Sequence, residues 1–189
     1  MNLYFMAGAS GSGKTAIMPH LKELWGKRIA VYDFDEIGVP KDADTKWRQE
    51  STEKWLQKLL SDNQDACLLG QMVLGEIFAC PSATQLSKIN FCFLDVSDIE
   101  RIKRLRKRGT YGADQNMLSW AAWLRMHLFD PHWHLQAIKE NSWSALNWSA
   151  LDDLSSWTQK ANIKIIDTSK DDVAKTAKKI AGWVQSRLK

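Results

Sequence analysis

Short apolar runs alternate along this chain with longer stretches that have helical periodicity. The apolar runs span residues 3–7, 28–35, 66–70, 89–96 and 163–169, and polar or turn-forming residues bound each one. Near-continuous apolar runs of this length are typical of strands buried on both faces. Because helical stretches separate the runs, the pattern predicts βαβ units and a five-stranded parallel sheet.

The stretches between these runs carry apolar residues at the spacing of an amphipathic helix. The predicted helices span residues 14–25, 45–60, 99–108 and 171–188. Residues 109–161 are longer than a compact connection requires and are rich in tryptophan, and Pro131 is expected to divide them into at least two helices. We therefore expect a single α/β domain over residues 1–189, with a lid and helical insertion at about 109–161.

Composition places few further limits on the protein. The 189 residues carry a net charge of +4, which agrees with binding of anions but does not require nucleic acid. Three cysteines, Cys67, Cys80 and Cys92, show no disulfide spacing, so we expect reduced thiols, with Cys67 and Cys92 in the core. No apolar run reaches the roughly 18 residues of a membrane span. No signal peptide is recognisable, and we expect a cytoplasmic protein.

The segment GASGSGKT, from Gly8 to Thr15, is the strongest signal in the sequence. It matches the phosphate-binding pattern G-x-x-x-x-G-K-[ST] between a predicted strand and a predicted helix. In such a loop Lys14 would bridge the β- and γ-phosphates, and the Thr15 hydroxyl would ligate Mg²⁺. The alternative is a Gly/Ser-rich turn that matches by chance. The loop predicts a bound nucleoside triphosphate without separating a kinase from an ATPase or GTPase.

Two carboxylates, Asp33 and Asp35, end the second predicted strand. Period-two spacing would put both on one face of that strand, at the edge where parallel sheets bind ligands. Asp33 could hold the hydration shell of Mg²⁺, and Asp35 could accept a proton from an attacking hydroxyl. Which of the two is the base stays open. The alternative is a polar strand end beside a helix cap.

A run of basic residues follows the fourth predicted strand. Arg101, Arg104 and Arg108 share one helical face, and Gly109 and Gly112 then provide flexible positions. Arginines before a glycine-hinged segment suit a lid over phosphates, because the guanidinium grips phosphate with two donors. A solvated basic face and a nucleic-acid patch are the alternatives, although the chain lacks the exposed aromatics of the latter.

The order of these motifs resembles the small P-loop kinases, the group of shikimate kinase, gluconate kinase and adenylate kinase. The motifs are GASGSGKT, then DFD, LDVS, RLRKRG and IDTS. The segment RLRKRGTYGADQNML is most similar to the lid of gluconate-kinase-like enzymes. The resemblance covers about residues 1–118 and 162–189. It implies a three-layer αβα P-loop NTPase fold.

The resemblance also implies roles for individual residues. ATP and Mg²⁺ would be bound by the loop, which comprises Gly8, Ser10, Gly11, Ser12, Gly13, Lys14, Thr15 and Ala16. Asp33 would be the acid on the metal side and Asp35 the acid on the substrate side. Arg104 and Arg108 would be lid or adenine-side arginines. The backbone at Thr168 and Ser169 would run past the adenine. The implied acceptor-side residues are Arg48, Gly70 and Gln71.

The tryptophan-rich segment has no counterpart in that group. The spacing of Trp120, Trp123, Leu124 and Leu128 favours a core face, with a cap over the acceptor pocket or a dimer face as alternatives. Arg125 on the same predicted helix is expected to point toward the phosphates.

Three histidines follow or end this helix, namely His127, His132 and His134. They could hold zinc only if they converged, which a helix start after Pro131 disfavours.

The sequence therefore predicts an ATP-dependent kinase that transfers the γ-phosphate to a hydroxyl of a sugar acid or similar metabolite. Lys14, Asp35, Arg104 and Arg108 are the expected catalytic residues, and the protein is expected to be a monomer or homodimer. A nucleoside or nucleotide kinase is the first alternative. A nucleotide-binding regulatory or nucleic-acid-processing protein is the second, and binding of nucleic acid or membrane is not expected.

Overall fold

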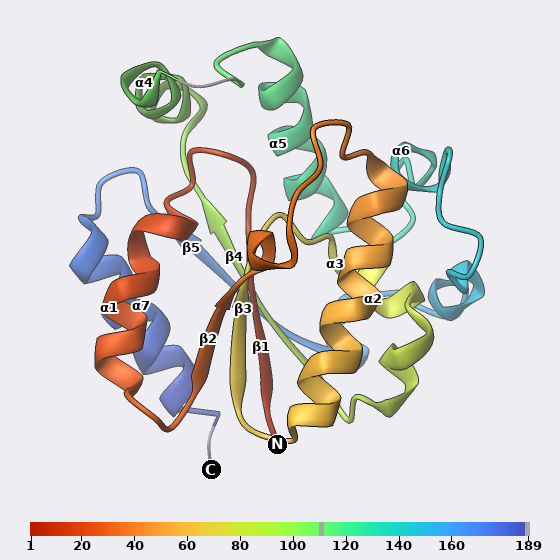
Figure 1. The fold of residues 1–189 in the computed structure, drawn as a ribbon. Coiled ribbons are helices and arrows are strands. Elements are labelled where there is room, and N and C mark those ends of the chain that lie inside the picture. The colour runs from red at the N-terminus through yellow and green to blue at the C-terminus, as the bar shows by residue number, and fades with distance from the viewer. Residues whose placement is uncertain (110–111, 188–189) are drawn as a thin grey trace.

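Five parallel strands form the central sheet, and the computed structural model describes residues 1–109 and 112–187 (Figure 1). The strands lie in the order β2-β3-β1-β4-β5. Their bounds are β1 Leu3–Ala7, β2 Ala30–Asp33, β3 Ala66–Leu69, β4 Ile89–Asp95 and β5 Ala161–Asp167. All four neighbouring pairs are parallel, which confirms the predicted five-stranded parallel sheet.

Strands β2 and β5 differ most from the predicted runs, by two residues at each end, and β3 and β4 each end one residue early. β2 ends at Asp33, because the chain turns there into a 3₁₀ helix over Phe34–Ile37. The Asp33 carboxylate caps that turn by accepting a hydrogen bond of 3.1 Å from the backbone N–H of Asp35. β5 begins at Ala161, opposite Ile89, so it starts two residues before the predicted strand at 163. Asp35 therefore lies on the turn and not on the strand, and the predicted period-two placement of Asp33 and Asp35 on one strand face is wrong.

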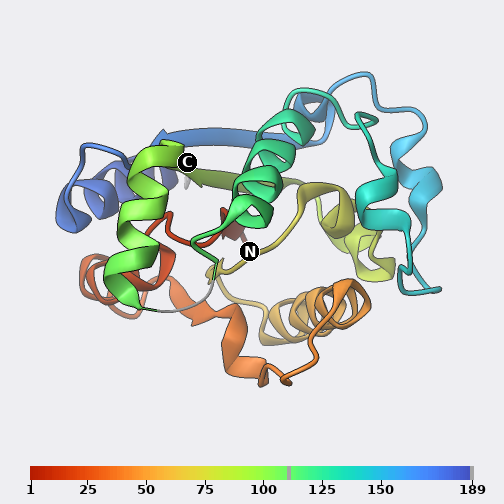
Figure 2. The ribbon, with the colours of Figure 1, turned by 90° about the horizontal axis from the view of Figure 1, so that it is seen from above.

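Helices cover both faces of the sheet and form the outer layers of a three-layer domain (Figures 1 and 2). The helix bounds are α1 Lys14–Trp25, α2 Thr45–Asp62, α3 Leu74–Ala79, α4 Asp98–Arg108, α5 Gln115–His127, α6 Gln136–Lys139 and α7 Val173–Gln185. On β1 the side chains alternate, so Tyr4 and Met6 pack with α1 and α7, whereas Leu3 and Phe5 pack on the side of α2 and α3.

The four predicted long helices are all present, with ends shifted by a few residues. The predicted end of the last helix at residue 188 lies outside the described residues. The sequence pattern missed α3, because its six residues are nearly all buried and show no polar face.

The tryptophan-rich insertion contains α5, α6 and two 3₁₀ turns, Trp148–Leu151 and Trp157–Gln159. Pro131 lies between α5 and α6, as predicted. Trp123 and Leu124 are buried in the core beside α3, and Trp120 and Leu128 pack half-buried against it. The predicted core face is thus confirmed. Residues 110 and 111 of the predicted lid lie outside the described residues.

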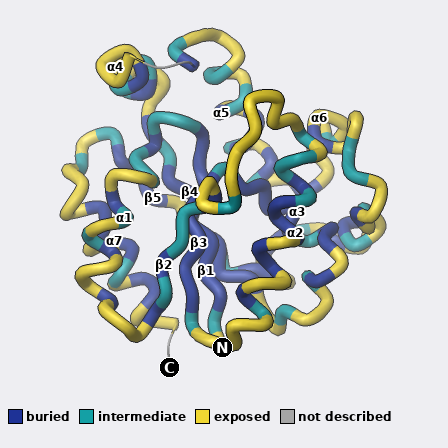
Figure 3. Tube along the Cα trace, in the orientation of Figure 1, coloured by how far each residue is buried: buried dark blue, intermediate teal, exposed yellow. Residues whose placement is uncertain are grey.

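Burial is deepest in the sheet and on the inner faces of the helices (Figure 3). Cys67 and Cys92 are free and buried there, as expected, and Cys80 is buried too. Among residues 1–109 and 112–187, no helix is long and apolar enough to cross a membrane.

Candidate active site

A cavity of about 870 Å³ opens where the carboxyl ends of β1, β2 and β3 meet. Its walls are the loop after β1, the turn after β2, the start of α2, the end of β3 and the end of α4. The lining residues used below are Ser10, Gly11, Gly13, Lys14, Thr15, Ala16, Asp33, Phe34, Asp35, Val39, Asp44, Trp47, Arg48, Gly70, Gln71, Arg104 and Arg108. Binding at this edge is the rule for open parallel sheets.

The loop from Gly8 to Lys14 folds tightly between β1 and α1. Gly8 has a φ of 154°, and a Cβ there would lie 2.4 Å from the carbonyl oxygen of Leu94. Only glycine permits so close an approach, so the first glycine of the motif is fixed by sterics. The loop leads directly into the N-terminus of α1, whose unpaired backbone N–H groups and dipole favour a bound anion.

Lys14 turns its ammonium group over this loop. Its Nζ donates to the carbonyl oxygens of Gly8 at 2.6 Å and Ala9 at 3.3 Å. Burial lowers the pKa of Lys14 to about 8, with Arg101 adding to the effect and Asp35 and Asp33 opposing it. A cation held at this position is ready to exchange carbonyl oxygens for phosphate oxygens.

The aspartates after β2 face the same cavity as Lys14 and Thr15. Asp33 is half-buried and Asp35 exposed, and burial together with the charge of Asp33 raises the pKa of Asp35 above its usual value. A raised pKa suits a group that accepts a proton during the reaction.

These oxygen donors fit a magnesium ion that is bound together with nucleotide. The Thr15 hydroxyl and the Asp33 carboxylate both line the cavity, and Mg²⁺ prefers one or two protein oxygens plus phosphates and water. Within the described part of the chain, no three His, Cys, Asp or Glu side chains gather as a metal cage.

The histidines of the insertion have protein partners instead. His127 stacks on Trp123 with ring centroids 4.7 Å apart, and its Nε2 accepts a 3.2 Å bond from the backbone N–H of Gly75. Burial lowers the pKa of His127 to about 4. The Nε2 of His132 lies 3.0 Å from the carbonyl oxygen of Leu154.

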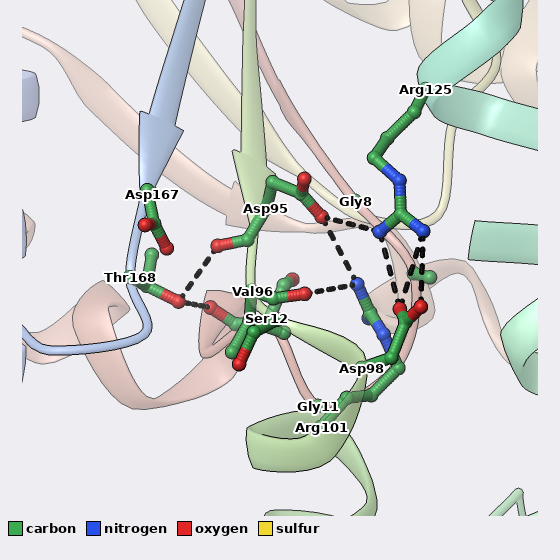
Figure 4. Close-up of polar contacts among 12 residues, drawn as sticks. Gly8, Gly11, Ser12, Asp95, Val96, Asp98, Arg101, Arg125, Asp167 and Thr168 are labelled. Atoms are coloured by element: carbon green, nitrogen blue, oxygen red, sulfur yellow. Dashed lines mark hydrogen bonds and ion pairs between the residues drawn. The ribbon is translucent and has the colours of Figure 1, made fainter. Parts of the chain in front are cut away.

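Arg101 ties the phosphate-binding loop to the end of β4 (Figure 4). Its side chain is fully buried and donates to the carbonyl oxygens of Ser10 at 2.7 Å and Val96 at 3.3 Å, and to Asp95 at 3.2 Å. The three arginines were expected on one helical face. Arg101 is instead buried behind the loop, whereas Arg104 and Arg108 line the cavity. Substitution of Arg101 would remove the donor to the carbonyl oxygen of Ser10 and leave Asp95 with Arg125 as its remaining arginine partner.

Arg104 lies between the cavity and the end of β5. It donates to the carbonyl oxygen of Thr168 at 2.6 Å and to its hydroxyl at 3.0 Å, and to the carbonyl oxygen of Gly11 at 3.4 Å. The Thr168 hydroxyl also lies 3.1 Å from the carbonyl oxygen of Ser12. This network joins α4, β5 and the loop behind the phosphate position.

Arg48 enters the cavity from α2, on the side opposite α4. Its Nε and Nη2 donate to the two carboxylate oxygens of Glu76 at 2.9 and 2.6 Å, and its guanidinium lies 5.2 Å from the ring centroid of Trp120. Burial alone would lower the pKa of Arg48, but the charge of Glu76 and the hydrogen bond to it outweigh burial and raise that pKa above its ordinary value.

Gln49 connects this pair to the insertion. Its amide nitrogen donates to Glu76 at 2.9 Å and to the carbonyl oxygen of Ile138 at 2.8 Å, while its amide oxygen accepts from the backbone N–H of Trp143 at 2.7 Å. Gln49 is fully buried, so three satisfied hydrogen bonds replace its contact with water. The insertion therefore braces the α2 side of the cavity, where Arg48 lies, from behind.

Gly70 and Gln71 complete the floor at the end of β3. A Cβ on Gly70 would lie 2.3 Å from the Cβ of Phe34, so the turn after β2 and the end of β3 touch directly. A larger residue at position 70 would displace Phe34 and the aspartates beside it.

Most of the predicted site residues come together in this cavity, but five do not line it. Arg125 pairs with Asp95 and Asp98 at 3.2–3.3 Å and does not reach the cavity, which corrects its expected position near the phosphates (Figure 4). Gly8, Ser12, Thr168 and Ser169 are not among the lining residues. Gly8, Ser12 and Thr168 shape the loop from behind, and Ser169 bonds through its hydroxyl to the backbone N–H of Ser97 at 2.8 Å. Nucleotide binding by these four residues stays a prediction.

Sequence reasoning missed Glu76, Gln49, Trp47 and Phe34. A glutamate inside the apolar run LGEIFA was the available signal for Glu76, because buried carboxylates are nearly always paired. For Gln49 no signal existed, since its partners Ile138 and Trp143 lie about ninety residues away.

A phosphate-binding loop after β1 of a 2-3-1-4-5 parallel sheet defines the P-loop NTPase fold. Solved structures confirm this fold. No family model and no curated protein sequence matches the chain. The shikimate kinase from Acinetobacter baumannii in complex with shikimate is 15% identical, with a TM-score of 0.57, and the match covers 99% of this chain and 94% of that one.

Two further kinases show the same likeness. A sugar kinase from Janibacter sp. HTCC2649 is 14% identical, with a TM-score of 0.59 and coverage of 98% and 95%. A gluconokinase from Sinorhizobium meliloti 1021 is 14% identical, with a TM-score of 0.57 and coverage of 97% and 92%. The chain thus has the fold of the small P-loop kinases over nearly its whole length.

Proposed function

We propose that this protein is an ATP-dependent kinase that transfers the γ-phosphate of ATP to a hydroxyl of a small molecule. The single observation that carries the proposal is one cavity that contains the phosphate-binding loop on one side and Asp35 with Arg48 on the other. A phosphoryl donor and an acceptor can lie in line across such a cavity.

The roles of the residues follow from their positions. Backbone N–H groups of the loop and Lys14 would hold the phosphates, and Thr15 and Asp33 would hold Mg²⁺, which neutralises charge on the phosphates when bound. Arg104 and Arg108, at the cavity end of α4, would stabilise charge on the transferred group. Asp35 would orient the acceptor hydroxyl and take its proton.

Solved structures of a shikimate kinase, a sugar kinase and a gluconokinase resemble this chain in fold, which supports a kinase that acts on a small molecule. Incubation with γ-labelled ATP and a pool of small metabolites, followed by separation of labelled products, is the decisive screen. We expect label in an organic phosphate ester. Label that appears only in inorganic phosphate, or only in a nucleotide, would contradict the proposal in favour of a nucleotide hydrolase or a nucleotide kinase, respectively.

A further inference from the structure

We propose that the phosphoryl acceptor is an uncharged polyhydroxylated molecule, and that Glu76 sets this preference by holding Arg48 in a neutral ion pair. This inference rests on the proposed kinase function and narrows its substrate class. It departs from the sugar acid that the sequence led us to expect.

The positive charges of the cavity are unevenly placed. Among the described lining residues the cations are Lys14, Arg48, Arg104 and Arg108. Lys14 belongs to α1, and Arg104 and Arg108 belong to α4, so these three are on the nucleotide side. Among the described lining residues, Arg48 on α2 is therefore the cation that lies on the acceptor side.

The guanidinium group of Arg48 already forms an ion pair with a carboxylate of the protein. Glu76 is fully buried and engages Nε and Nη2 of Arg48, which are the two donors that grip a substrate carboxylate side-on. Gln49 donates to the same Glu76 oxygen that Nη2 contacts, so the carboxylate is fixed from the insertion. The Arg48 side chain is only 16% exposed. A second anion would meet a neutral pair in place of a free positive charge.

Further negative charge faces the same space. Asp35 and Asp44 both line the acceptor side, so an anionic acceptor would meet two carboxylates beside the neutral pair of Arg48 and Glu76. Both aspartates are exposed, so solvent screens part of their repulsion, and the remainder acts against an anion at short range. These groups disfavour a carboxylate or phosphate on the acceptor.

The remaining groups suit hydroxyls. Nη1 of Arg48 and the amide of Gln71 can donate hydrogen bonds, and the oxygens of Asp35 and Asp44 can accept them. The ring of Trp47 is half-buried and packs edge-on against the buried Phe34, with centroids 6.0 Å apart, and it offers apolar surface for the C–H face of a polyol or sugar.

The wild-type protein tests the inference without any substitution. A small-molecule extract is divided by anion and cation exchange into neutral, acidic and basic fractions, and each is incubated with γ-labelled ATP. We expect a labelled ester from the neutral fraction. An ester formed only from the acidic or the basic fraction overturns this inference and leaves the kinase function intact, whereas no ester from any fraction overturns the kinase function itself.

Glu76→Gln then tests the positioning role of this residue. The neutral acceptor is compared with its carboxylated counterpart, such as a hexitol with the hexonate of the same carbon chain, by kcat/KM at saturating ATP. Loss of the carboxylate leaves the charge of Arg48 unopposed, so we expect the preference for the neutral acceptor to fall by about tenfold or more. A merely structural role would lower both activities alike and leave their ratio unchanged, and that result would overturn the assignment.

Glu53→Gln is the matched control. Glu53 is also buried, but it lies on α2 away from the cavity and accepts from the backbone and hydroxyl of Ser82 at 3.2 and 2.5 Å. We expect this variant to keep the wild-type preference. Circular dichroism and thermal unfolding report whether each variant is folded. If Glu76→Gln does not fold, the experiment with neutral, acidic and basic fractions and the wild-type protein still tests the preference for an uncharged acceptor.

Discussion

The two sides of the cavity are built in different ways. The nucleotide side of the proposed site is lined mainly by one contiguous stretch, Ser10 to Ala16, at the N-terminus of α1. The acceptor side joins Arg48, Glu76 and Trp120, which come from α2, α3 and α5. A contiguous backbone site is visible in sequence, whereas a site assembled from distant side chains is visible only in the fold.

The two sides should also respond differently to substitution. Damage to the nucleotide side should affect every acceptor equally, because all reactions use the same donor. Damage to the acceptor side should change the KM of the acceptor and leave that of ATP unchanged.

Lys14→Ala should abolish transfer, with kcat/KM for ATP reduced by about 10³ or more, because the phosphates lose their cation. Steady-state kinetics with saturating acceptor measures the loss. Lys22→Ala is the matched control, since Lys22 is exposed on the same helix, and should behave as wild type. Near-normal activity of Lys14→Ala would contradict the proposed role of the loop in phosphoryl transfer.

Asp35→Asn should lower kcat by about 10² to 10⁴, the range of general-base catalysis, while the Kd of ATP changes by no more than about threefold. Rate measurements and calorimetric titration with ATP test the two parts separately. A variant that keeps full kcat would remove Asp35 from its assigned role and leave Asp33 as the candidate base.

Gln49→Ala should raise the KM of the acceptor about tenfold and leave the KM of ATP unchanged, because Glu76 and Arg48 lose their brace. The loss of three buried hydrogen bonds should also reduce the free energy of unfolding by about 2–4 kcal/mol. Denaturant titration measures this change. Gln57→Ala on the exposed side of α2 is the control, and equal effects of the two variants would contradict the role of the insertion.

The affinity for ATP should depend on pH through Lys14, whose pKa is lowered to about 8 by burial. Phosphates bind the protonated amine, so affinity is fully present below this pKa and declines as the pH rises through it. Between about pH 7 and pH 9 the protonated fraction falls about tenfold, and the Kd of ATP should rise accordingly. Lys14→Arg keeps its charge over this range and should show a flat profile. A wild-type profile that is equally flat would contradict the lowered pKa.

Trp120→Leu should have the smallest effect, a rise of about two- to fivefold in the KM of the acceptor, because a cation–π contact contributes about 0.5–1 kcal/mol. The KM of ATP is the internal control. A larger change in the KM of ATP than in the KM of the acceptor would contradict the assignment of Trp120 to the acceptor side.

The sequence was sufficient for the sheet, the long helices and the phosphate-binding loop, because each depends on a local pattern. It misplaced Asp35 on a strand, since a 3₁₀ turn leaves no periodic signal in four residues. It also placed Arg125 near the phosphates, because its partners Asp95 and Asp98 lie 30 and 27 residues away in sequence and no local pattern links them. Long-range pairs such as Arg48 with Glu76 have no local signature, and the contribution of the insertion to the acceptor side followed only from the structure.

The account is tested most directly by measuring ADP and inorganic phosphate together, with and without the active metabolite fraction. A kinase for this acceptor should release ADP only when the acceptor is present, with little inorganic phosphate. Equal amounts of ADP and inorganic phosphate, unaffected by the fraction, would contradict the account and identify a nucleotide hydrolase.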